Sequence, residues 1–289
     1  MKIEDTFPLG IGTFRFDLAQ QERGLEALRA SFELGQNFID TSYLYDDGKN
    51  LELIAKFLRT ISRDEIYISL YLEKFVESVT DIHYQLDRDL EILDVDYVDC
   101  LMVHEPAVSK IPLVETYAEL DKIKQLGGTK SLGGSNFSPE ELRIINKQFP
   151  LDVFVGVYNL ENKVYEDLGA LDYCREYGIE FVAYQPLRRN RTAMTNYPEL
   201  VALADKYDKT QNQIVLNWLV RDKKIRPMIK SENIERIKEN ASALSFDMTS
   251  EDYAILNHFR AKRFDEIKID WTGVGDDGIV VHQLPNQQI

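Results

Sequence analysis

The sequence has few cysteines and no long apolar run. Its 289 residues include only Cys100 and Cys174, which lie far apart and show neither a CxxC pair nor metal-type spacing. No apolar run approaches the roughly 18 residues that a membrane-spanning helix needs. The first ten residues, MKIEDTFPLG, contain no apolar signal segment. We therefore expect a cytoplasmic protein in a reducing environment, with no membrane partner.

Positive charge is also scarce. The chain has 34 Lys and Arg against 49 Asp and Glu, which gives a formal net charge of −15. Because clustered Lys and Arg bind nucleic acids and anionic membrane surfaces, this composition argues against both as partners. The four histidines show no metal-site spacing, so we expect no metal. Two of them, His83 and His258, fall in helical stretches, where surface or packing roles are expected.

The chain does contain many apolar residues, and they occur in short runs at regular places along the sequence. Apolar residues make up 44% of the chain, enough for a large core. Short apolar runs alternate with amphipathic stretches eight times, an order typical of parallel strands joined by helices. This order predicts an α/β fold, the (β/α)8 or TIM barrel. The expected strands cover residues 8–14, 37–42, 66–70, 97–104, 130–136, 152–157, 180–186 and 224–229.

Local signals agree with the barrel. The competing fold, a doubly wound open sheet, is disfavoured because no GxGxxG sequence follows the first strand. Gly35 and Gly178 each follow a helical run and precede a strand, where glycine commonly ends a helix. Ser138, with Glu141 three residues later, forms a capping-box pattern at a helix start. We expect a single domain over 1–289, in which 259–289 is a divergent C-terminal segment.

The barrel fold predicts where the site lies. Residues just beyond the carboxyl ends of the strands form the active site of such barrels, whereas the other end mostly stabilises the fold. This rule selects a set of polar residues that should converge at one mouth. They are Asp40 and Tyr45, His104, Ser135 and Asn136, Tyr184 and Gln185, and Lys230 and Ser231.

The sequence around these strand ends resembles the aldo-keto reductase superfamily between about Pro8 and Asn257. No single motif is diagnostic, but six occur in the expected order: GIGTF, FIDTSYLY, VDCLMVHEP, GGSNFSPEEL, FVAYQPL and IKSENIERIKEN. The resemblance implies an oxidoreductase that uses NADPH to reduce a small carbonyl substrate. It also implies a cofactor that lies extended across the barrel mouth.

The resemblance assigns catalytic roles to three residues. Carbonyl reduction needs a hydride on carbon and a proton on the developing alkoxide, so a proton donor must lie near the nicotinamide. Tyr45 is the expected donor, His104 orients the carbonyl, and Asp40 organises the pair. A tyrosine with a pKa near 10 is a reluctant donor. Members of the family therefore place a lysine beside it, directly after strand three and paired with the aspartate.

This lysine is missing here. Alignment of the third strand places Tyr71, or Leu70 on a one-residue shift, at its position, and Tyr71 therefore joins the catalytic candidates. The nearest replacement is Lys74, which would reach Asp40 only if its loop bends back; otherwise it is a surface lysine. Without the cation, we expect a less acidic Tyr45 and slower chemistry.

Residues for the nicotinamide end of NADP(H) are largely present. Ser135 and Asn136 match the pair that holds the carboxamide, and Tyr184 offers a flat ring that can support the nicotinamide. The glutamine expected at the end of strand six is replaced by Val155 or Gly156.

The phosphate end is better preserved. Lys230, Ser231 and Arg236 supply a cation, a hydroxyl and a forked guanidinium, which suits a ribose 2′-phosphate. Alternatively, these residues belong to a charged helix that is exposed to solvent and binds no phosphate. The full expected cofactor-binding set is Gly12, Thr13, Asp40, Ser135, Asn136, Tyr184, Gln185, Pro186, Leu187, Lys230, Ser231, Arg236, Glu239 and Asn240.

Both ends of the chain depart from the family. Strand one begins almost at once, so something other than the family's β-hairpin should cover the bottom of the barrel. Near the C-terminus, GDDG followed by IVV predicts a turn and then a strand. The segment 271–284 either folds over the mouth and shapes the substrate pocket, or forms an interaction strand. Glu105, beside His104, favours a cationic or hydroxyl-rich substrate unless it is solvent-exposed.

Three functions therefore stay open. An active reductase for a small aldehyde, ketone or sugar-like carbonyl is favoured by Tyr45, His104 and Asp40. An NADP(H)-binding pseudoenzyme or redox sensor is favoured by the missing lysine. A barrel repurposed for a non-redox biosynthetic step is disfavoured by Tyr184. We expect a monomer or a weak homo-oligomer.

Overall fold

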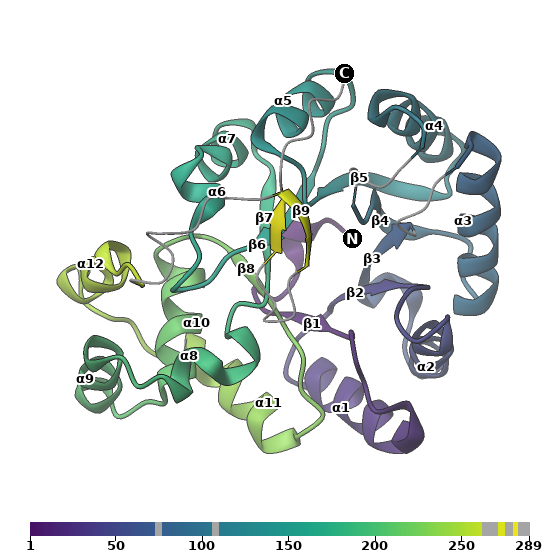
Figure 1. Cartoon of the computed structure of the whole chain (residues 1–289). Coiled ribbons are helices and arrows are strands. Elements are labelled where there is room, and N and C mark those ends of the chain that lie inside the picture. Colours follow the sequence, from purple (N-terminus) through teal and green to yellow (C-terminus); the bar gives the residue numbers. More distant parts are fainter. Residues whose placement is uncertain (73–76, 106–109, 262–270, 275–279, 283–289) are drawn as a thin grey trace.

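A closed barrel of eight parallel strands forms the centre of the molecule (Figure 1). The structure is a computed structural model that describes all residues except 73–76, 106–109, 262–270, 275–279 and 283–289. The strands pair in chain order, and β1 pairs with β8 to close the barrel. The predicted (β/α)8 fold is confirmed. The strands are β1 (Gly10–Gly12), β2 (Phe38–Ser42), β3 (Tyr67–Leu72), β4 (Val98–Val103), β5 (Thr129–Ser135), β6 (Val153–Val157), β7 (Glu180–Tyr184) and β8 (Arg226–Ile229).

Helices surround the barrel (Figure 1). The α-helices are α1 (Gln21–Glu33), α2 (Lys49–Leu58), α3 (Val79–Leu93), α4 (Leu113–Leu126), α5 (Pro139–Gln148), α6 (Val164–Asp167), α7 (Ala170–Tyr177), α8 (Arg191–Met194), α9 (Pro198–Tyr207), α10 (Gln211–Arg221), α11 (Ile234–Ala241) and α12 (Ser250–His258). The 3₁₀ helices are η1 (Ile3–Asp5), η2 (Leu18–Gln20), η3 (Arg63–Glu65), η5 (Arg188–Asn190) and η6 (Ser242–Leu244). No helix in the described part of the chain is long and apolar enough to cross a membrane.

Two predicted helix boundaries are confirmed. Helix α5 begins with the capping box, in which Ser138 Oγ accepts a hydrogen bond from the Glu141 amide and the Glu141 carboxylate accepts one from the Ser138 amide. Helix α7 ends at Gly178, whose φ of 69° lies in the left-handed region that glycine adopts without steric cost.

The strands are buried on both faces, as expected for a parallel sheet covered by helices. Side chains that fill the barrel form one cluster, which includes Phe38, Tyr67, Cys100 and Met228. A second, larger cluster lies between the strands and the helices. Because side chains alternate along a strand, Asp40 points to the same side of β2 as Phe38, into the barrel.

The bottom of the barrel is covered by the 3₁₀ turn η1. Ile3 packs against the inner cluster. Arg226, at the start of β8, donates hydrogen bonds to the carbonyl oxygens of Thr6 and Phe7, each at 3.1 Å. From the sequence we expected something other than a β-hairpin to cover the bottom of the barrel, and η1 with the residues after it does so.

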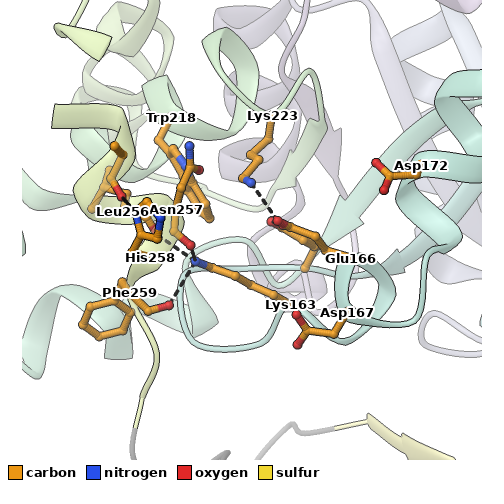
Figure 2. Close-up of polar contacts among 12 residues, drawn as sticks. Lys163, Glu166, Asp167, Asp172, Trp218, Lys223, Leu256, Asn257, His258 and Phe259 are labelled. Atoms are coloured by element: carbon orange, nitrogen blue, oxygen red, sulfur yellow. Dashed lines mark hydrogen bonds and ion pairs between the residues drawn. The ribbon is translucent and has the colours of Figure 1, made fainter. Parts of the chain in front are cut away.

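A buried lysine binds the end of helix α12 (Figure 2). Lys163, between β6 and α6, is 4% exposed, and its Nζ donates to the carbonyl oxygens of Leu256, Asn257 and Phe259 at 2.7, 3.0 and 3.1 Å. These oxygens lie at the end of α12, where carbonyls have no partner within the helix. Burial, and then repulsion by Arg260, lowers the pKa of Lys163 to about 7.

We predict that Lys163→Met lowers the free energy of unfolding by about 3 kcal/mol, because one buried and two partly buried carbonyls lose their hydrogen-bond donor. The matched control is Lys238→Met. Lys238 is exposed and, among the described residues, pairs only with Glu235, a surface contact that contributes less than about 1 kcal/mol. Urea unfolding of both variants measures the difference. Equal losses would show that the Lys163 contacts do not hold α12.

Two further strands follow α12. They are β9 (Trp271–Val274) and β10 (Val280–His282), which pair antiparallel in a sheet separate from the barrel. The strand predicted after GDDG is thus present. Whether 271–284 shapes the pocket or contacts a partner stays a prediction, because 275–279 and 283–289 lie outside the described residues.

Candidate active site

The four catalytic candidates lie together at the carboxyl ends of neighbouring strands. In β2, Asp40 pairs in register with Gly12 of β1, and Ser42 with Tyr71 of β3. The ring of His104, directly after β4, lies 5.3 Å from that of Tyr71 and 6.4 Å from that of Tyr45, between centroids. Both tyrosines are buried. The barrel therefore brings two phenols, an imidazole and a carboxyl to one place.

The carboxyl of Asp40 is buried, and no cation in the described part of the chain pairs with it. It accepts hydrogen bonds from the Thr13 backbone N–H and the Tyr71 hydroxyl, but its buried Oδ1 has no partner. No Lys, Arg or His of the described residues forms an ion pair with it, and Lys74 lies outside those residues. Burial raises the pKa of Asp40 to about 7, because desolvation disfavours the charged form. The hydrogen bonds oppose this rise only in part.

The protonation state of Asp40 affects Tyr45. Burial raises the pKa of the Tyr45 phenol well above its usual value, and the charge of Asp40 raises it further. Tyr45 therefore keeps its proton at neutral pH and can offer it to an acceptor. Ionisation of Asp40 makes that proton harder to release, whereas a neutral Asp40 removes the repulsion between the two negative charges.

The polar residues after β5 and β7 form one hydrogen-bonded group. Asn136 adopts a left-handed backbone (φ 57°), a conformation that asparagine tolerates better than most residues. Its Nδ2 donates to the carbonyl oxygen of His104 and to Ser135 Oγ, and its Oδ1 accepts from the Tyr184 hydroxyl at 2.9 Å. This contact fixes the half-buried ring of Tyr184 near the mouth.

Val155 and Gly156, the two candidates for the family's glutamine position, both lie in β6. Val155 packs inside the barrel. At Gly156, a Cβ atom would lie 2.6 Å from the Tyr165 ring, so no larger residue fits without movement of that ring. The next amide along the chain, Asn159, donates from Nδ2 to the carbonyl oxygen of Gln185.

Lys230, Ser231 and Arg236 lie around the start of α11. Lys230 Nζ is 3.3 Å from the buried carboxylate of Glu232, which leaves its charge partly neutralised. Arg236 is exposed, and no acidic residue in the described part of the chain forms an ion pair with it. The amide of Arg236 is capped by Asn233 Oδ1 at 3.0 Å. A cation, a hydroxyl and a guanidinium at this rim fit a phosphate group.

The other expected cofactor-binding residues differ in burial and in their hydrogen-bond partners. Thr13 is fully buried, and its Oγ1 lies 2.8 Å from both the Asp40 carbonyl oxygen and Asn50 Oδ1. Glu239 accepts a hydrogen bond from Thr210 at the start of α10, and Asn240 is buried. Gln185, which has a left-handed backbone (φ 52°), begins the loop after β7 that continues through Pro186 and Leu187.

Sequence reasoning missed the residues that hold these loops. Asn50 of α2 is fully buried; its Nδ2 donates to the Thr13 carbonyl oxygen and its Oδ1 accepts from Thr41. Arg188 forms a buried ion pair with Glu161, which ties the loop after β7 to the loop after β6. A lone Asn or Arg in a helix or loop carries no sequence signal for such a contact. In the described residues, no group of His, Cys, Asp and Glu could hold a metal ion.

The chain is similar in sequence to known aldo-keto reductases. An aldo-keto reductase of Mycolicibacterium vanbaalenii is 30% identical, and the alignment covers 88% of each chain. Aldo-keto reductase family 1 member C23 of Equus caballus is 28% identical over 86% of each chain.

Solved structures are also similar. A thermostable aldo-keto reductase bound to the inhibitor epalrestat superposes with a TM-score of 0.82 at 28% identity, covering 87% of this chain and 94% of that one. A Bombyx mori aldo-keto reductase in complex with NADP gives 0.76 at 27% identity, covering 87% and 88%. The sequence model of the aldo/keto reductase family matches residues 8–261. The chain therefore belongs to the aldo/keto reductase family.

Proposed function

We propose that this protein reduces a small aldehyde, ketone or sugar-like carbonyl compound with NADPH, and that Tyr45 donates the proton. The observation that carries the proposal is the grouping of the buried Tyr45, Tyr71 and Asp40 with the half-buried His104 at the carboxyl ends of β2 to β4. Membership of the aldo/keto reductase family supports the reaction class. The Bombyx mori relative solved with NADP, and a Klebsiella pneumoniae relative solved with NADPH at 25% identity, support the cofactor.

The chain's own donors fit such a cofactor. Lys230, Ser231 and Arg236 would hold the 2′-phosphate, and Ser135 and Asn136 would hold the carboxamide. The aromatic face of Tyr184, fixed through its hydroxyl, would support the nicotinamide ring. When bound, the nicotinamide supplies the hydride.

Side chains of the protein donate the proton to the substrate carbonyl and orient that carbonyl. Tyr45 donates its phenolic proton to the carbonyl oxygen as negative charge develops there. His104, whose ring lies beside both tyrosines, donates to the same oxygen and orients it. Burial of the tyrosines excludes water, which strengthens these hydrogen bonds.

Tyr71 takes the place of the family's lysine. Its hydroxyl donates to Asp40, and its own pKa is raised well above the usual value by burial and then by the charge of Asp40. A phenol supplies no positive charge, so the site depends on a neutral Asp40 to keep Tyr45 able to donate. We therefore expect proton donation by Tyr45 to be slow. Slow turnover also favours an alternative function, in which the protein binds NADP(H) as a sensor without turnover.

We predict that Tyr45→Phe abolishes carbonyl-dependent oxidation of NADPH, because the ring is kept but the transferable proton is lost. The assay follows NADPH absorbance with a panel of activated aldehydes, diketones and open-chain sugars at high enzyme concentration. NADPH affinity, measured by fluorescence titration, should change less than about threefold. Turnover by Tyr45→Phe equal to the wild type would remove Tyr45 as the donor. No turnover by the wild type, with NADPH still bound, would favour the sensor.

We also predict that Arg236→Ala weakens NADPH binding by about tenfold or more and leaves NADH binding nearly unchanged, because only NADPH carries the 2′-phosphate. Lys238→Ala, on the same helix but paired with Glu235, is the charge-matched control. Equal losses for the two dinucleotides, or an equal effect of the control, would contradict the phosphate assignment.

A further inference from the structure

The loop that carries Tyr45 has an unusual backbone. Tyr45 lies in the loop 43–48, between β2 and α2. The next three residues, Asp46, Asp47 and Gly48, all have left-handed backbones, with φ of 57°, 52° and 82°. Residues other than glycine adopt this conformation mostly one at a time, and a strained backbone persists only where the surrounding structure holds it. Contacts outside these three residues must therefore keep the loop in place.

Hydrogen bonds close a turn just before Tyr45. The amide of Tyr45 donates to the carbonyl oxygen of Ser42 at 3.0 Å, and Ser42 Oγ donates to a carbonyl oxygen of β3 at 3.0 Å. The amide of Gly48 donates to the carbonyl oxygen of Tyr43 at 2.8 Å. Tyr43 is thus a central residue of the turn, and it also binds the last residue of the loop. The placement of Tyr43 therefore affects the direction in which the chain presents Tyr45.

The ring of Tyr43 lies against α3 and the start of α2. These two helices lie side by side around the barrel (Figure 1). The guanidinium carbon of Arg88, on α3, lies 3.4 Å from the centre of the Tyr43 ring, where the face of the ring attracts a cation. A Cβ atom at Gly48, the residue before α2, would lie 2.6 Å from the same ring. The half-buried ring of Tyr43 is therefore confined by Arg88 and by the backbone of Gly48.

Arg88 is itself held in place by a buried acid. Its Nε and Nη2 both donate to Asp89 Oδ1, at 2.9 and 2.7 Å. The side chain of Asp89 is 1% exposed, and that of Arg88 is 20% exposed. Because two donors of one guanidinium bind the same oxygen, the orientation of the guanidinium plane is restricted. Helix α3 therefore presents to Tyr43 a planar cation whose position is set by its neighbour in the helix.

We propose that Arg88 is a positioning residue: it holds the ring of Tyr43, and through the turn that begins at Ser42 it sets the position of the Tyr45 phenol. The catalytic consequence rests on the proposed function, in which Tyr45 must lie within hydrogen-bond reach of the carbonyl oxygen. The placement of Tyr45 itself does not rest on that function. A displacement of about 1 Å at a reacting group, caused by a change elsewhere in a protein, can slow a reaction by about 100-fold.

The first test compares variants of both partners in carbonyl-dependent oxidation of NADPH. Arg88→Met keeps a long side chain but loses the planar cation, whereas Tyr43→Leu removes the ring and keeps the pair of Arg88 with Asp89. We expect each variant to lower kcat by about tenfold or more and to change NADPH affinity by less than about threefold, because only the position of the proton donor changes. Tyr43→Phe keeps the ring and should retain about half or more of the wild-type kcat.

A double variant and a control separate positioning from general stability. If Arg88 acts through Tyr43, the double variant Arg88→Met/Tyr43→Leu should lose no more kcat than either single variant, because both changes remove the same interaction. The control is Arg59→Met. Arg59, at the end of α2, also bridges to α3, through the exposed Asp94, and its loss should leave kcat within about twofold of the wild type. Losses that add in the double variant, an equal loss in the control, or an unchanged kcat in Arg88→Met would overturn the proposal.

The second test needs no turnover. Tyrosine labelled with carbon-13 at Cζ reports the surroundings of each phenol by NMR, and the Tyr45 signal is assigned by its loss in Tyr45→Phe. We expect Arg88→Met and Tyr43→Leu to shift this signal, and Tyr43→Phe and Arg59→Met to leave it in place. An unchanged Tyr45 signal in Arg88→Met would overturn the proposal. Absence of turnover by the wild type, with the shift still observed, would count against the proposed function and support the positioning of Tyr45 by Arg88.

Discussion

Closure of the barrel by the pairing of β1 with β8 is the constraint on which the site depends. Because all eight strands are parallel, closure brings every carboxyl end to one rim, and residues far apart in the sequence become neighbours. Asp40 of β2 and Tyr71 of β3 meet for this reason. The opposite end, covered by η1 and fastened by Arg226, contributes stability rather than chemistry.

The buried carboxyl of Asp40 affects the pKa values of both tyrosines of the site. A charged Asp40 would be costly in the barrel interior and would hold the Tyr45 proton more tightly. A neutral Asp40 avoids both effects while it still accepts a hydrogen bond from Tyr71. Tyr71 and Val155, which are candidates for the positions where the family resemblance led us to expect a lysine and a glutamine, pack inside the barrel. In the described part of the chain, no ammonium pairs with the carboxyl of Asp40, and burial raises its pKa to about 7.

The fold could be predicted from the sequence because the order of the apolar runs and the helix-capping residues specify it. Each expected strand is present, and Ser138 and Gly178 bound helices as their residue types predict. The placement of the catalytic candidates also followed, since strand ends of a closed barrel must converge. The raised pKa of Asp40 and the contacts of Asn50 could not be predicted, because they depend on burial and on partners from distant segments.

The most direct test of this account is the titration of the Asp40 carboxyl, followed by its infrared absorption and assigned by its loss in Asp40→Asn. We predict a midpoint near pH 7, with the carboxyl neutral below this pH and ionised above it. The Tyr71→Lys variant, which restores an ammonium next to the carboxylate, should move the midpoint down toward the ordinary value of about 4 or below. A wild-type midpoint near 4 would contradict the account, because it would show that a charged Asp40 is stabilised in the barrel without the lysine.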